Sequence, residues 1–191
     1  MNRNILIWLG LFALMAFPVI RAISNPYLPF RETSYIIAGF AGIFCLSIFV
    51  LQPLLATRRI PLHPFRARRL HRIVGICVLS LTIIHVAGLF VTNSDDVIDV
   101  FMLRAPTTFS IFGVIAFWGI ILTGLIATLR HSLPSFIWRK THQTLSCIVI
   151  SATIIHALQI QGAMEPISKW IICLAAILST VVALIWQKQR T

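Results

Sequence analysis

The sequence predicts an all-α fold, a polytopic membrane protein whose residues 1–191 form one bundle of six transmembrane helices. Hydrophobic residues make up 58% of the chain and charged residues only 11%, whereas soluble domains carry roughly 25% charged residues. The charges are also segregated, because six long uncharged runs contain most of the chain. A helix that crosses a bilayer needs about 17–25 apolar residues, and the length of every run falls in that range.

The first three helices are predicted at about 4–20, 33–57 and 69–94. Arg3 precedes the first apolar run as in a signal peptide, but no clear cleavage site follows, so we expect this helix to be retained. The dipeptide Asn25-Pro26 separates the first helix from the second. Pro61 and Pro64 mark the basic loop before the third helix, as expected of residues that interrupt helices.

The last three helices are predicted at about 105–129, 139–164 and 168–187. Pro106 opens the fourth helix, Pro134 separates the fourth from the fifth, and Pro166 starts the sixth. Proline is favoured at the beginning of a helix and disfavoured inside it. Because lipid offers no hydrogen bonds, a segment that crosses it alone must bond its own backbone, which a helix does.

The charge distribution predicts the orientation of the bundle. The chain has 16 Lys and Arg residues and five Asp and Glu residues, a net charge of +11. With both termini in the cytoplasm, 12 of the 16 basic residues, Arg58, Arg59 and Arg190 among them, lie inside and all five acids lie outside. Membrane proteins concentrate Lys and Arg in short cytoplasmic loops. We therefore expect an integral protein of the plasma membrane (the inner membrane of a bacterium), surrounded by lipid and without a nucleic-acid partner.

Histidines recur at one spacing on two predicted helices. His85 follows His71 on the third helix at the same interval at which His156 follows His142 on the fifth (85 − 71 = 156 − 142 = 14). This interval makes nearly four helical turns, so both histidines of a helix face one way, about 21 Å apart. The two helices are parallel because one crossing separates them. If they face each other, His71 meets His142 as an inner pair, and His85 meets His156 as an outer pair.

Two stacked pairs of histidines fit haem better than a bare metal ion. Zinc takes four protein ligands, or three and a water, and the runs offer no Cys, Asp or Glu at these depths. Haem iron needs only two axial ligands, since the porphyrin supplies four nitrogens. We therefore expect two b-type haems between the third and fifth helices, forming a one-electron path across the membrane.

Two other classes of function stay open. A proton or metal transporter would use the histidines as relays and would need no pigment. A structural membrane subunit would carry them as core residues bonded to neighbouring carbonyls, although ionisable residues inside a membrane usually serve a function.

Arginines beside the histidines are candidates for binding the cofactor. Arg69 and Arg72, together with Arg68, lie next to the inner pair. A guanidinium group binds a carboxylate such as a haem propionate with two parallel hydrogen bonds. Arg31 or Arg104 would serve the outer haem in the same way. Each of these arginines also has a plain interpretation as a topology signal.

The remaining potential site residues are assigned no cofactor. Gly75 and Gly88 follow His71 and His85, and either admit a flat ring or serve ordinary helix packing. His63 and His131 lie in or beside loops and have no partner at the spacing of the four histidines. The four cysteines lie inside apolar runs and form no C-x-x-C pair, so we expect neither a metal site nor a disulfide; they are Cys45, Cys77, Cys147 and Cys173.

The residues around the histidines resemble the ferric-reductase-like transmembrane domain. Arg69-Leu70-His71-Arg72-Ile73-Val74-Gly75, followed by Ile84-His85, resembles its third helix, and Trp138-Arg139-Lys140-Thr141-His142, followed by Ile155-His156, resembles its fifth. This superfamily includes ferric reductases, NADPH oxidases and the haem-binding membrane subunit of the bacterial methionine sulfoxide reductase system. The resemblance covers nearly the whole chain, and it implies haem b with His71 and His142 on the inner iron and His85 and His156 on the outer iron.

The chain also departs from complete ferric reductases, which continue into a cytoplasmic flavin and NADPH module. Its sequence has no glycine-rich nucleotide loop, and His63-Pro64-Phe65-Arg66 falls in a short loop rather than on a flavin-binding barrel. We therefore expect electrons from a separate cytoplasmic flavin reductase carrying FMN or FAD, or from quinol. The expected acceptor is an extracytoplasmic reductase of the methionine sulfoxide type, or ferric iron. The chain would be the haem-containing electron-transfer subunit of a membrane oxidoreductase, with no substrate site of its own.

Overall fold

The computed structural model of the chain describes residues 2–57 and 60–188, and within them every regular element is a helix. Arg58, Arg59 and Arg190, which belong to the predicted cytoplasmic charges, lie outside the described residues. The α-helices are α1 (Arg3–Ile23), α2 (Thr33–Phe49), α3 (Leu51–Thr57), α4 (Pro64–Thr92), α5 (Ser94–Phe101), α6 (Thr108–Thr128), α7 (Ser135–Gln159) and α8 (Pro166–Lys188). Two short 3₁₀ helices, η1 (Leu28–Phe30) and η2 (Leu129–His131), complete the set.

Six of the helical segments are long and apolar enough to cross a membrane, which confirms the predicted all-α class and the number of spans. The second span consists of α2 and α3, which meet at Val50, and the fourth consists of α6 with η2. Many large apolar side chains point away from the protein; Phe12, for example, is 67% exposed and Ile20 is 60% exposed. Surfaces of this kind suit a lipid environment rather than water.

Two of the helices begin earlier in the structure than the sequence predicts. The third span begins at Pro64, five residues before the predicted 69, because Pro64 occupies the first turn and Nδ1 of His63 accepts the backbone N–H of Phe65. Proline suits that position, since the N–H it lacks would have no partner there. The fifth span begins at Ser135, four residues before the predicted 139, and ends at Gln159, five before 164.

The acidic segment after the third span forms the short helix α5. The side chain of Asn93 accepts the backbone N–H of Asp96 and caps α5. Asp95 and Asp96 occupy its first turn, where negative charge is favourable beside the positive end of the helix dipole.

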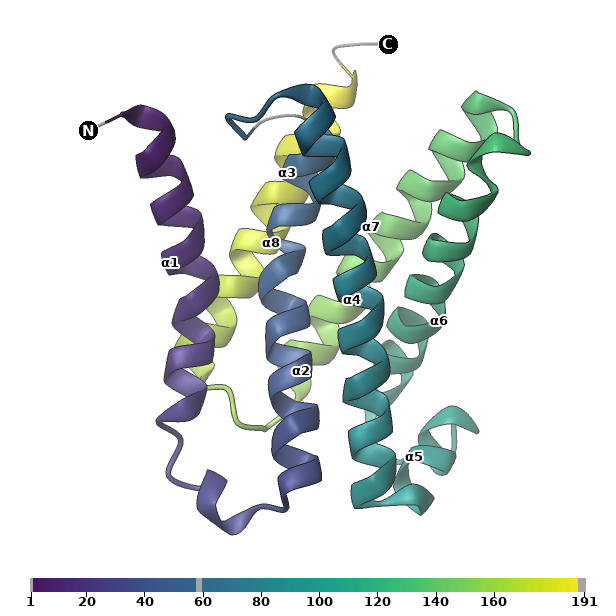
Figure 1. The fold of residues 1–191 in the computed structure, drawn as a ribbon. Helices are drawn as coiled ribbons and strands as arrows, with labels where there is room; N and C mark the ends of the chain where they lie inside the picture. The colour runs from purple at the N-terminus through teal and green to yellow at the C-terminus, as the bar shows by residue number, and fades with distance from the viewer. Residues whose placement is uncertain (1, 58–59, 189–191) are drawn as a thin grey trace.

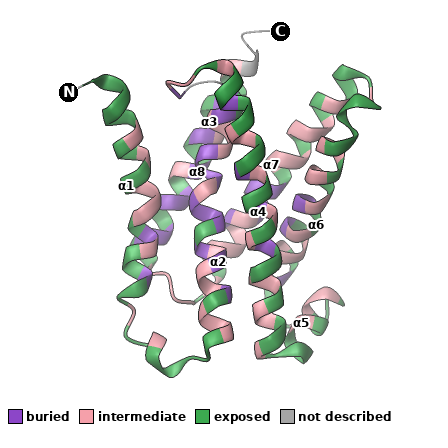
Figure 2. Cartoon of the chain, viewed as in Figure 1, coloured by how far each residue is buried: buried purple, intermediate pink, exposed green. Residues whose placement is uncertain are grey.

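The bundle contains two intimate helix pairs, α2 with α4 and α6 with α7, while direct contacts between the pairs are few. Helices α1 and α8 pack on the side of α2 and α3 (Figure 1). The buried core gathers along α2, α3 and α8 and reaches α7 through Val149 and Ile150, whereas most of α1 is exposed or half-buried (Figure 2). The start of α1 and the end of α8 lie at the same end of the bundle (Figure 1).

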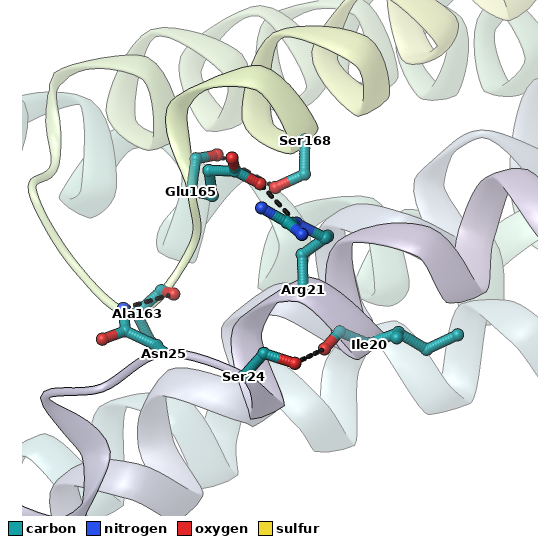
Figure 3. A network of polar contacts seen from close by, with 7 residues as sticks. All are labelled: Ile20, Arg21, Ser24, Asn25, Ala163, Glu165 and Ser168. Atoms are coloured by element: carbon teal, nitrogen blue, oxygen red, sulfur yellow. Dashed lines mark hydrogen bonds and ion pairs between the residues drawn. The ribbon is translucent and has the colours of Figure 1, made fainter.

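At the opposite end of the bundle, polar contacts connect the end of α1 and the residues after it to the loop before α8 (Figure 3). Nε of Arg21 donates to Oε2 of Glu165 at 2.6 Å, and the side-chain amide of Asn25 donates to the carbonyl of Ala163 at 2.9 Å. Nζ of Lys169 donates to the carbonyl of Ile160 in the same loop. The guanidinium group of Arg21 holds the pKa of the Glu165 carboxyl below its usual value.

Candidate functional site

The four spaced histidines lie on the two helices that the sequence predicts, one helix from each intimate pair. His71 and His85 are on α4, and His142 and His156 are on α7. All four side chains are half-buried within the bundle. The two helices run in the same direction along the bundle (Figure 1), so residues at equal depth on α4 and α7 can meet across it.

The inner pair lies toward the end of the bundle where α1 begins. The ring centroids of His71 and His142 are 6.5 Å apart, and the ring planes are inclined by 70°. When two imidazoles bind one metal ion from opposite sides, each nitrogen lies about 2 Å from the metal and each ring centre roughly 1 Å further, so the ring centres are about 6 Å apart. The separation of His71 and His142 therefore fits a single six-coordinate iron between them.

Nδ1 of His71 and Nδ1 of His142 have different surroundings. Nδ1 of His71 lies 3.2 Å from the carbonyl of Gln52, and the amide nitrogen of the Gln52 side chain, turned toward the ring, reaches Nδ1 at 2.6 Å. The His142 ring instead stacks on Trp138, with the centroids 5.7 Å apart and the planes inclined by 21°. Within the described part of the chain, Nδ1 of His142 and Nε1 of Trp138 are buried without a hydrogen-bond partner, although the backbone of Thr123 acts electrostatically on His142.

The outer pair is held by two matching hydrogen bonds. Nδ1 of His85 donates to the carbonyl of Ala38 at 2.7 Å, and Nδ1 of His156 donates to the carbonyl of Phe109 at 2.8 Å. A carbonyl can only accept, so Nδ1 carries the proton in both rings and Nε2 keeps the lone pair that binds a metal. The two rings are also close enough to interact electrostatically.

Glycines on α2 and α6 lie against the outer histidine rings, whereas Gly75 and Gly88 have other neighbours. A Cβ atom at Gly88 would lie 2.9 Å from Cβ of Ala38, which favours a helix-packing role for Gly88. A Cβ atom at Gly75 would lie 3.1 Å from the side-chain amide group of Gln52. The glycines against the imidazole rings are Gly42 on α2 and Gly113 on α6, where a Cβ atom would lie within 3.0 Å of His85 and 2.8 Å of His156, respectively.

An internal repeat is the sequence signal that would have identified these glycines. Adding 71 to a residue number relates α2 and α4 to α6 and α7: His71 becomes His142 and His85 becomes His156. The same shift relates Gly42 to Gly113 and the acceptor Ala38 to the acceptor Phe109. Between 42–88 and 113–159, 16 of 47 positions carry the same residue, including the identical segments 82–85 and 153–156. The two helix pairs are thus parallel copies of one unit, each supplying one histidine to each pair.

The predicted arginine partners are exposed on α4, and Arg69 and Arg72 lie to the sides of the helix face that carries His71. Residues two apart on a helix do not share a face, whereas residues three apart do. Arg68, three residues before His71, therefore lies closer to the face of the inner pair than Arg69 does. Its counterpart in the repeat is Arg139, three residues before His142, which the sequence analysis did not single out.

The other candidate residues lie away from the four histidines. His63 caps α4, and Nε2 of His131 accepts from Nε of Arg130 at 2.9 Å. The guanidinium group of Arg31 lies over the ring of Tyr35, 5.2 Å from its centroid. The four cysteines have free thiols. In the described ranges, no three residues among His, Cys, Asp and Glu come together as a metal site, so the histidines form two pairs and not one four-ligand cluster.

Searches of protein-family models, curated proteins and solved structures gave no match to this chain. The class that the structure itself defines is a helical protein with six segments able to cross a membrane.

Proposed function

We propose that the protein transfers electrons across a membrane through two b-type haems, each held by one histidine of α4 and one of α7. The observation that carries the proposal is the inner pair, in which the rings of His71 and His142 lie 6.5 Å apart, the spacing suited to one iron. The outer pair adds two rings whose Nε2 atoms are left free by hydrogen bonds at Nδ1.

Different groups of the protein would have different roles in binding haem. When bound, haem supplies an Fe(III)/Fe(II) couple that accepts and releases one electron at a time. Nε2 of His85 and Nε2 of His156 would bind the outer iron, and the carbonyls of Ala38 and Phe109 would keep these rings in the required tautomer. One ring nitrogen of His71 and one of His142 would bind the inner iron. The surrounding apolar helices exclude water, which would keep electrons from leaking to solvent.

Charged groups near the inner pair would hold the propionates. Arg69 and Arg72 are the predicted partners on α4, and the helix phase adds Arg68 and Arg139. A carboxylate close to the inner pair could also satisfy Nε1 of Trp138, which has no partner within the described residues. Arginine is suited to this task because its planar fork matches the two oxygens of a carboxylate.

The direction of electron transfer is inferred from the distribution of Lys and Arg. The partners are inferred from the resemblance to the ferric-reductase-like transmembrane domain. The excess of Lys and Arg at the end of the bundle that carries the termini supports a cytoplasmic location for that end, with the bundle in the plasma membrane or bacterial inner membrane. The donor would be a cytoplasmic flavin reductase or quinol. The acceptor would be an extracytoplasmic reductase of the methionine sulfoxide type, or ferric iron. The chain would thus be the haem-containing subunit of a membrane oxidoreductase.

Vesicles containing the purified protein test this function. Ferricyanide is trapped inside the vesicles and dithionite is added outside. Neither compound crosses the lipid readily, so the loss of ferricyanide absorbance measures electron transfer across the membrane. We expect bleaching with the wild-type protein at a rate at least tenfold above that of vesicles with His85→Ala or of empty vesicles. Equal rates in all three would contradict the proposal. Proton uptake by wild-type vesicles that contain no haem would favour the alternative, a histidine relay.

A further inference from the structure

The outer histidines contact α2 and α6 in the same way. Each ring lies against a glycine, Gly42 or Gly113, and bonds the carbonyl one turn earlier; we call each such glycine and carbonyl a notch. In a helix, the N–H of residue i bonds the carbonyl of residue i − 4, so Gly42 bonds the carbonyl of Ala38 and Gly113 bonds that of Phe109. These are the same two carbonyls that accept Nδ1–H of His85 and His156, at 2.7 Å and 2.8 Å. Each carbonyl therefore accepts twice, once within its own helix and once from a histidine of the partner helix.

Glycine is what leaves these carbonyls open. A helical side chain covers the turn that precedes it, so any side chain at Gly42 or Gly113 would stand beside the carbonyl one turn earlier. At Gly42 a Cβ atom would lie 3.0 Å from Nδ1 and 3.2 Å from Cε1 of His85. At Gly113 it would lie 2.9 Å from Nδ1 and 2.8 Å from Cε1 of His156. The atoms in the way belong to the part of each ring that makes the hydrogen bond.

The two notches arise at equivalent positions of the repeat. Residues 38, 42 and 85 become residues 109, 113 and 156 when 71 is added. The acceptor residues themselves differ, Ala38 and Phe109, which is consistent with a role for the backbone carbonyl and not for a side chain. Glycine is kept in both copies at the single position where a Cβ atom would meet the ring.

We propose that Gly42 and Gly113 are positioning residues for the outer iron. They let His85 and His156 donate Nδ1–H to backbone carbonyls, which leaves the lone pair of Nε2 available to the iron. This inference rests on the proposed haem function. Both glycines act on one metal site, although they lie on different helices and in different copies of the repeat. A hydrogen bond at Nδ1 makes the imidazole a stronger donor to iron, which stabilises the ferric state.

Alanine substitutions with matched controls test the inference. Gly42→Ala and Gly113→Ala are compared with Gly39→Ala on α2 and Gly124→Ala on α6, where a Cβ atom would meet no described atom within 4 Å. Each purified variant is assayed for haem per chain, for the midpoint potential of each haem and for the low-spin ferric electron paramagnetic resonance spectrum. The His85→Ala variant identifies which spectral component belongs to the outer haem.

We expect Gly42→Ala and Gly113→Ala to change the same component, the outer haem, by shifting its potential to a more positive value or by lowering its content. The inner haem, Gly39→Ala and Gly124→Ala should keep wild-type values. Unchanged potentials, spectra and haem content in both notch variants would overturn the inference, and so would an equal effect in the controls. A change confined to one of the two variants would also overturn it.

A second measurement separates this inference from the proposed function. Nitrogen-15 NMR of histidine-labelled, haem-free protein reports which ring nitrogen carries the proton. We expect His85 and His156 to be protonated at Nδ1 in the wild type, with their signals assigned from His85→Ala and His156→Ala. Each notch variant should lose the signal of the histidine that its glycine faces. A wild-type protein that binds no haem would refute the proposed function. A haem-loaded wild type with silent notch variants would refute only the positioning role.

Discussion

The inner and outer histidine pairs come from the same internal repeat, yet the protein holds them by different means. The outer rings donate to main-chain carbonyls through notches at Gly42 and Gly113, and the two hydrogen bonds are nearly equal in length, at 2.7 Å and 2.8 Å. Nδ1 of His71 also lies beside a main-chain carbonyl, that of Gln52, but at 3.2 Å, and both inner rings have side-chain neighbours, the Gln52 amide beside His71 and Trp138 stacked on His142. Main-chain atoms of a helix are fixed by the fold, whereas side chains rearrange. The outer site is therefore the more preorganised of the two.

The difference originates in the helices that face the histidines. Opposite the outer pair, α2 and α6 are regular and bring a glycine close to each ring. Opposite the inner pair, the second span is interrupted at Val50, and Gln52 lies in the first turn of α3. Its counterpart in the repeat is Thr123 within the unbroken α6. The halves therefore differ near the inner pair in the regularity of the helix that faces it, although Gln52 and Thr123 occupy equivalent positions.

The largest expected effect is the loss of one haem on removal of a ligand. His85→Ala and His156→Ala should each lower the haem content from two per chain to one and leave the inner component of the spectrum unchanged. His71→Ala and His142→Ala should remove the inner component instead. Haem-to-protein ratios and reduced-minus-oxidised spectra of the four variants check this. The assignment fails if variants from the same pair affect different components.

Arginine substitutions distinguish the two sets of candidate propionate partners near the inner pair. A hydrogen bond to a charged group contributes about 1.5–3 kcal/mol, so the loss of one should weaken binding roughly tenfold or more. We expect this for Arg68→Gln and for Arg139→Gln, with a smaller effect for Arg69→Gln because of its position on the helix. Rates of haem transfer to apomyoglobin measure the difference. If Arg69→Gln releases haem fastest, the helix-phase argument is wrong.

Trp138→Phe tests the side-chain support of the inner pair. The substitution keeps an aromatic ring to stack on His142 and removes Nε1–H, which is buried without a partner in the described structure. An unsatisfied buried donor costs about 1–3 kcal/mol, so haem-free Trp138→Phe should be more stable than the wild type by about 1 kcal/mol. Chemical denaturation in detergent measures the change. A loss of stability would mean that Nε1 has a partner in the protein.

The smallest expected effect concerns the ion pair between Arg21 and Glu165 (Figure 3). Because the pKa of Glu165 is lowered in the folded protein, the pair stabilises the fold above the carboxyl's ordinary pKa of about 4.5. That contribution disappears as the pH falls through the lowered value. Glu165→Gln should therefore melt slightly below the wild type at pH 7. The difference should narrow as the pH is lowered below 4.5, and a gap that is the same at every pH would contradict the linkage.

Much of the fold follows from the sequence because lipid imposes a simple rule on long apolar runs. Six helical segments within the described residues are long and apolar enough to cross a membrane, and the four histidines lie on α4 and α7 as predicted. The predicted start at residue 69 was wrong, because Pro61 and Pro64 were assigned together to the loop, although Pro64 opens the helix. The short helix α5 was missed, since the helices were predicted from long uncharged runs and the first turn of α5 contains Asp95 and Asp96.

The support of the site was harder to predict than its ligands. Gly75 and Gly88 were chosen for their closeness to the histidines in sequence, but contacts between helices are set by packing. Gly42 lies on a different span from His85, and only the pairing of α2 with α4 brings them together. The internal repeat contains this information, because it keeps both histidines and the notch glycine in register. Comparison of the two halves would have identified Gly42, Gly113 and Arg139.

The haem content of the purified wild-type protein tests the central claim most directly. The pyridine haemochrome assay measures haem b, and amino-acid analysis measures the chain. Two haems per chain with low-spin, bis-histidine spectra are predicted from the two pairs on α4 and α7. A preparation that stays colourless after expression with haem precursors and after incubation with haem would contradict the account.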